Sequence, residues 1–105
     1  MSGRIDELVL EVPPDRAGEA CRIALAELGW SAEATGEERL AGREGTDRLC
    51  CHQSPATVEI ELRANGNKGT AIRMSGSVPG FGPVSSEHLS SRMEALWRHL
   101  LAAAR

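Results

Sequence analysis

The last third of the chain carries the pattern that most restricts the possible folds. After a loop at residues 78–83, the sequence to Arg105 repeats apolar residues at the spacing of an amphipathic α-helix. The repeated residues are Leu89, Met93, Leu96, Trp97, Leu100 and Leu101. A helix with so wide an apolar stripe has to pack on another element. Because most of the remaining sequence consists of short alternating segments, the expected partner is one face of an antiparallel β-sheet.

Residues 57–64 and 70–77 are the two clearest predicted strands, since apolar and polar residues alternate along both. The apolar positions are Val58, Ile60, Leu62, Ile72 and Met74. The intervening residues 65–69 are Asn, Gly and Lys, which favours a tight hairpin because Asn and Gly tolerate positive φ angles. Alternation of this kind predicts one buried face and one hydrated face.

Residues 5–12 predict a further strand, with an irregularity near residues 7–9. Its expected apolar positions are Ile5, Leu8, Leu10 and Val12. Pro13 and Pro14 end this strand and favour the start of a helix, because proline suits the first helical turn.

The helix that starts there is expected to continue to about Leu28. Its predicted apolar face is formed by Ala17, Cys21, Ala24, Leu25 and Leu28. Gly29 is the expected stop, because glycine adopts the left-handed cap conformation at little cost. Trp30 is then placed to fold back on the last helical turn.

The middle of the chain has weaker patterns. Residues 31–34 alternate, residues 35–38 have the composition of a turn, and residues 39–43 are expected to return as the second arm of a hairpin. Residues 47–53 predict another short strand that ends before Pro55. The chain is therefore expected to have some four or five strands.

Together these segments predict an α+β fold in a single domain over residues 1–105. The predicted order is β-α-β-β-β(-β)-α, in which an antiparallel sheet carries the long C-terminal helix on one face. A chain of this length can bury a core without disulfides or metals.

Composition excludes several partners. The formal net charge of −3 provides no basic field for phosphates, and aromatic residues make up only 3% of the chain, which argues against nucleic-acid binding. No apolar run is long enough to span a bilayer, and the polar start lacks the apolar stretch of a signal peptide. We therefore expect a soluble, cytoplasmic protein.

No residue pattern indicates catalysis, a cofactor or a metal. The three cysteines are an odd number, and adjacent Cys50 and Cys51 would point to opposite faces of a strand. Cys21 lies on the predicted apolar face of the first helix, where a thiol is unreactive. His88 and His99 are too far apart on one helix to share a metal. We expect no catalytic, cofactor-binding or metal-binding residues, and hence no enzyme.

The C-terminal third also resembles a known superfamily. A strand that begins Gly69-Thr70, a loop rich in Gly and Pro at residues 78–83 and a long final helix resemble the end of START-like helix-grip proteins, which include polyketide cyclase-like proteins. The Pro-Pro-Asp sequence at residues 13–15, after a first strand, is similar to the opening of that family. Members usually have more than 105 residues and six or seven strands, so the resemblance implies a shortened member.

The resemblance implies that an apolar ligand would lie between the sheet and the C-terminal helix. The residues that would line this space are Ile60, Leu62, Ile72, Met74, Phe81, Leu89, Met93 and Leu96. The alternative is that these side chains simply fill the core, which the short chain favours. Phe81 could gate a pocket or anchor its loop.

Two functions follow. The first is a small non-enzymatic module that binds an apolar small molecule in a helix-grip pocket. The alternative is a protein-interaction or homodimerisation domain that acts through a sheet edge or a sheet face, because a short open sheet leaves edges that pair readily.

Overall fold

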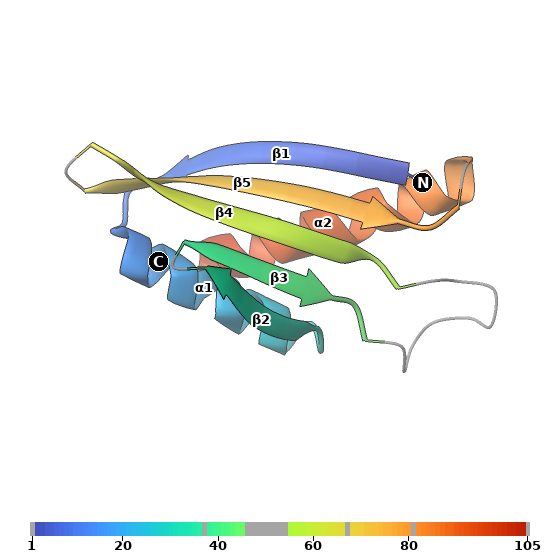
Figure 1. Cartoon of the computed structure of the whole chain (residues 1–105), viewed down its shortest axis with the longest axis horizontal. Coiled ribbons are helices and arrows are strands. Elements are labelled where there is room, and N and C mark those ends of the chain that lie inside the picture. The colour runs from blue at the N-terminus through green and yellow to red at the C-terminus, as the bar shows by residue number, and fades with distance from the viewer. Residues whose placement is uncertain (1, 37, 46–54, 67, 81, 105) are drawn as a thin grey trace.

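The computed structural model describes residues 2–36, 38–45, 55–66, 68–80 and 82–104. The elements in chain order are β1 (Ser2–Leu10), α1 (Pro14–Glu27), β2 (Ser31–Gly36), β3 (Arg39–Arg43), β4 (Thr57–Asn65), β5 (Gly69–Val78) and α2 (Pro83–Ala103). Five strands form one antiparallel sheet in the order β1-β5-β4-β3-β2, and both helices lie on the same side of it (Figure 1). The predicted α+β class and element order are confirmed.

The β4–β5 hairpin forms the centre of the sheet. Ile60 pairs with Met74 and Leu62 with Ile72, so the apolar residues of both strands share the inner face beneath the helices. Gly66, in the connecting turn, has a φ of +71°, the positive value expected of a tight Asn-Gly hairpin. The two-residue periodicity therefore predicted both the strands and their buried face correctly.

The predicted buried face of β1 was partly wrong. The strand is regular, and its register with β5 places Ile5 opposite Ser75 and Val9 opposite Ala71 on the outer face, where the two side chains are 58% and 56% exposed. Asp6 takes the inner face instead. Its carboxylate accepts a hydrogen bond from Trp97 Nε1 at 3.0 Å, which satisfies a polar group next to the core.

The first strand also ends two residues earlier than predicted. β1 stops at Leu10, and Val12 lies beyond it in the connection to α1. The Val12 carbonyl accepts a hydrogen bond from the buried Thr70 hydroxyl at 2.8 Å. A side chain of β5, rather than backbone pairing between strands, therefore holds this connection.

The end of α1 agrees with its sequence signal. The Gly29 amide donates to the Ala26 carbonyl at 3.0 Å and the Trp30 amide donates to the Leu25 carbonyl at 2.8 Å, the two bonds of a Schellman motif. Gly29 has the required φ of +76°, and Trp30 is buried against the core.

α2 packs on β1, β5 and α1 through a narrower stripe than its sequence suggests. Leu89, Met93, Leu96 and Leu100 are fully buried, whereas Trp97 is half-buried and Leu101 is 36% exposed. Leu101 was therefore wrongly assigned to the buried stripe, since it lies at the margin of the helix contact.

Two inner-face glycines allow this close approach of the helices. A Cβ atom at Gly76 would lie 2.5 Å from Met93 Sδ and 3.0 Å from Leu89 Cδ1, and one at Gly42 would lie 2.7 Å from Leu25 Cδ2. The space between the sheet and the helices is thus filled at these points.

Three sequence predictions lie outside the described residues. They are the strand at residues 47–53, the cysteines at positions 50 and 51, and the role of Phe81.

Candidate functional site

The predicted ligand-lining residues come together between the sheet and the helices. The seven that the structure describes belong to one apolar cluster and are between 0% and 6% exposed. They are Ile60, Leu62, Ile72, Met74, Leu89, Met93 and Leu96, whereas Phe81 lies outside the described residues. Because these side chains pack on one another, a ligand would have to reach them from an edge of the cluster.

A cleft of about 490 Å³ provides such an edge between the first half of α1 and the start of β3, and we call it the α1 cleft. Two core side chains, Leu40 and Leu62, form its apolar part. Gly18 of α1 keeps it open, since a Cβ atom there would lie 3.3 Å from Leu62 Cδ1. Among the residues that line the α1 cleft, only Leu62 had been predicted from the sequence to line a ligand site.

The rim of the α1 cleft is charged. Asp15 and Arg22 reach it from α1, and Glu38 and Arg39 reach it from the β2–β3 turn and the first residue of β3. Arg39 also contacts Glu61, with 3.8 Å between guanidinium nitrogen and carboxylate oxygen. An apolar floor with charges of both signs at its rim suits a compact molecule that has an apolar body and a polar head.

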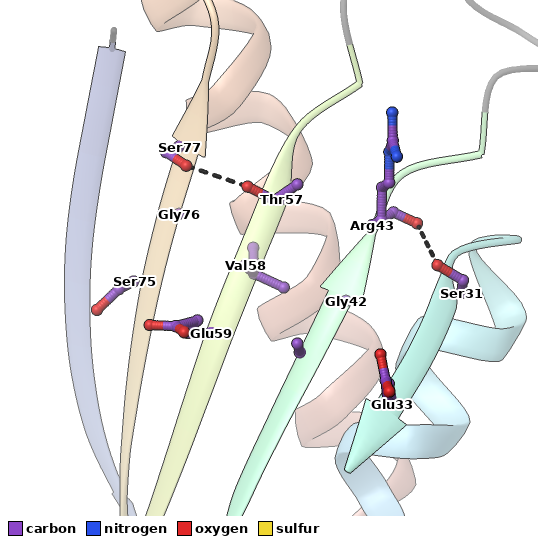
Figure 2. A pocket seen from close by; sticks show the side chains of 11 residues that line it. Ser31, Glu33, Gly42, Arg43, Thr57, Val58, Glu59, Ser75, Gly76 and Ser77 are labelled. Atoms are coloured by element: carbon purple, nitrogen blue, oxygen red, sulfur yellow. Dashed lines mark hydrogen bonds between the residues drawn. The ribbon is translucent and has the colours of Figure 1, made fainter. Parts of the chain in front are cut away.

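The outer face of the sheet, which faces away from both helices, carries shallow hollows, among them two of about 550 Å³ and 450 Å³. The larger has a volume of about 550 Å³, and its lining side chains come from β2, β3, β4 and β5 (Figure 2). Thr57 and Ser77 share a hydrogen bond of 3.1 Å there, and the Ser31 hydroxyl donates to the Arg43 carbonyl at 3.4 Å (Figure 2). The smaller, of about 450 Å³, lies over β1, β5 and β4. Sequence periodicity predicted a hydrated face but no hollow.

A partly buried pair of a glutamate and a histidine links the segments next to β3 and β4 with α2. Glu44, just after β3, accepts a hydrogen bond from the Ala56 amide at 3.1 Å, and its Oε1 lies 2.7 Å from His88 Nε2 of α2. His99 lies nearer the other end of α2, with its Nδ1 3.5 Å from Glu27 Oε2. His88 and His99 thus pair with different glutamates. In the part of the chain that the structure describes, no three His, Cys, Asp or Glu residues are grouped to hold a metal ion.

Cys21 is a buried thiol on the inner side of α1. Burial raises its pKa from 9.0 to about 12, and the nearby positive charge of Arg22 offsets this only in part. The thiol therefore stays protonated and unreactive at neutral pH, as its position on the apolar face of the helix indicated.

Comparisons with known proteins define the fold. A START superfamily protein from Mycobacterium smegmatis superposes with a TM-score of 0.68 at 8% identity, over 97% of this chain and 96% of that one. A protein from Nitrosospira multiformis gives 0.67 at 13% identity, over 99% and 97% of the two chains. A protein from Bacillus thuringiensis gives 0.61 at 8% identity, over 98% and 96%.

The chain therefore has a START-like fold, as the resemblance of its C-terminal third suggested. Identities this low indicate the fold alone. No protein-family model and no curated protein sequence matches the chain. None of the described helices is long and apolar enough to cross a membrane.

Proposed function

We propose that the chain is a small non-enzymatic binding module that takes a compact amphiphilic molecule in the α1 cleft. The observation that supports this is the cleft of about 490 Å³ on the helix side of the sheet, where Leu40 and Leu62 of the core meet a charged rim. Its volume falls within the range of small-molecule sites, roughly 300–1,000 Å³.

The packing of the core limits what the ligand can be. Met74 and Met93 are fully buried, and Gly76 already brings the sheet close to α2, so a bulky ligand would have to displace core side chains. An apolar group that rests on Leu40 and Leu62 would need no such displacement. The charges at the rim would then hold its polar end near solvent.

The test uses three probes of equal chain length that differ in the polar end: octanoate, octylamine and octanol. Methyl resonances of Leu40 and Leu62 are followed by NMR, and the melting temperature is measured in parallel. We expect at least one probe to shift both methyl groups and to stabilise the protein, by about 2.7 kcal/mol at a hundredfold excess over Kd.

Gly18→Leu fills the α1 cleft and should abolish these shifts, because the new side chain is built against Leu62. Glu19→Leu places the same side chain at an exposed position of α1 and should leave them unchanged. If no probe moves the Leu40 and Leu62 methyl groups, or if Gly18→Leu binds as well as the wild type, the α1 cleft is not the binding site.

A further inference from the structure

A row of alternating charges crosses the outer face of the sheet. Glu7 of β1 is in register with Arg73 of β5, Arg73 with Glu61 of β4, and Glu61 with Arg39 of β3. Arg73 lies 3.7 Å from Glu7, and Arg39 lies 3.8 Å from Glu61, between guanidinium nitrogen and carboxylate oxygen. This charge row thus alternates negative and positive over four neighbouring strands.

The charge row is complementary to its own reverse. If it is turned around and laid on itself, every negative position meets a positive one. We propose that a second copy of this chain packs on the outer face, related by a two-fold axis that runs parallel to the strands between β4 and β5. Glu7 then faces Arg39 of the second copy, and Arg73 faces Glu61 of the second copy. A two-fold dimer uses the same patch on both copies, and this patch meets that requirement.

The adjacent row fits the same arrangement. Ile5, Ser75, Glu59 and Ala41 are in register across β1, β5, β4 and β3. Under the two-fold axis, exposed Ile5 lies over Ala41 of the second copy, within the outer hollow of about 550 Å³, and Ser75 lies over Glu59. An apolar side chain thus meets an apolar one, and a hydroxyl meets a carboxylate that can accept its hydrogen bond.

The remaining outer-face arginines of the four strands avoid like charges. Arg63 is in register with Ala71, and the axis places it over Ala71 of the second copy. Arg43 reaches the row of Ser77 and Gly3 and is placed over Gly3 of the second copy. The proposed arrangement therefore brings no two charges of the same sign together among these rows.

The contact area indicates a weak and reversible dimer. The four strands lie about 4.8 Å apart, and each rises about 3.3 Å per residue. The part of the four strands that carries these rows therefore covers roughly 400 Å² of flat area per copy. Two such faces lie below the usual size of a stable interface, about 1,600 Å² in total. Aligned sheets also cross at about 30°, so the central pair of Arg73 with Glu61 contributes more than the outer pair. We expect dissociation to increase as salt screens these charges.

Charge exchange tests the proposal by sedimentation velocity at low salt. Arg73→Glu and Glu61→Arg each bring two like-charge pairs together across the two-fold axis, and each should weaken the homodimer about tenfold or more. A mixture of the two variants restores opposite charges at all four positions, so we expect a heterodimer with an affinity near that of the wild type. Glu19→Arg, an equally large charge change at an exposed position of α1, should leave the wild-type dimer intact.

The mixture separates contacts between copies from contacts within one sheet. Both variants alter the charge row of their own chain, so a purely intramolecular role would leave the mixture as dissociated as its components. The proposal is refuted by a wild type that remains monomeric at high concentration and low salt, by single variants that dimerise like the wild type, or by a mixture without heterodimer. Arg39 belongs both to the charge row and to the rim of the α1 cleft, whereas Arg73 and Glu61, which these variants change, do not line the cleft. The ligand test on Gly18 is therefore separate from this result.

Discussion

Gly76 provides a direct test of whether the space between the sheet and α2 is filled. Its neighbours are the fully buried Met93 and Leu89, whose Sδ and Cδ1 atoms would lie 2.5 Å and 3.0 Å from an added Cβ atom. Gly76→Ala therefore forces one of these side chains to move within a packed core. Overpacking of this kind costs about 1–3 kcal/mol. Because alanine restricts the unfolded chain more than glycine does, the substitution also stabilises the folded state by about 0.4–1 kcal/mol.

The net destabilisation expected for Gly76→Ala is therefore about 1–2 kcal/mol. For a chain of this size, each kcal/mol lowers the melting temperature by about 4–8 °C. Chemical denaturation followed by circular dichroism measures the free energy of unfolding. Gly3→Ala is the matched control: it makes the same change in strand β1, and its nearest new neighbour is the Gly76 carbonyl oxygen at an ordinary 3.6 Å. We expect that control to stay within about 0.5 kcal/mol of the wild type.

A double-mutant cycle identifies the contact responsible. In a Met93→Ala background the sulfur atom that blocks position 76 is absent, so Gly76→Ala should lose most of its cost there. A Gly76→Ala variant as stable as Gly3→Ala would mean that Met93 has room to move. Such a result would refute the filled core beneath α2 and favour a ligand cavity there instead.

Two further predictions concern polar groups at the core. Because burial raises the pKa of Cys21 from 9.0 to about 12, the folded protein binds more protons than the unfolded chain between these values, and stability should fall as pH rises above 9. Denaturation from pH 8 to 10.5 should show this decline in the wild type; an equal decline in Cys21→Ala would contradict the assignment. Asp6→Ala removes the acceptor of Trp97 Nε1–H and should cost about 1–3 kcal/mol, measured by urea denaturation. Glu11→Ala, at an exposed position just after β1, should cost under about 0.5 kcal/mol, and equal effects of the two changes would contradict the hydrogen bond as the cause.

Structural features that depend only on neighbouring residues were predicted correctly from the sequence. The helical spacing after residue 83, the alternation in β4 and β5 and the Gly29 stop of α1 each depend on a few consecutive residues, and the structure confirms them. β1 shows the limit of this approach. Its inner face includes Asp6 because a partner from the far end of the chain, Trp97, supplies a hydrogen bond.

The candidate site was predictable only in part. Leu62 was identified because alternation placed it on the inner face of β4. The sequence did not predict that Leu40, Gly18 and the charged rim line a site. α1 and β3 form a cleft only because the order of the strands in the sheet places them next to each other. The pair of Glu44 and His88 could not be predicted from the sequence either, because its members lie 44 positions apart in the chain.

The sequence by itself determined the kind and the order of the elements and the apolar stripe that requires a sheet beneath α2. Periodicity encodes these features locally, because backbone geometry makes side chains repeat every two or 3.6 residues. Only the tertiary structure decided that β1 pairs with β5, that the core closes around Gly76, and that Glu7, Arg73, Glu61 and Arg39 form one row. Those outcomes depend on the order and register of strands far apart in the chain, and no local pattern specifies them.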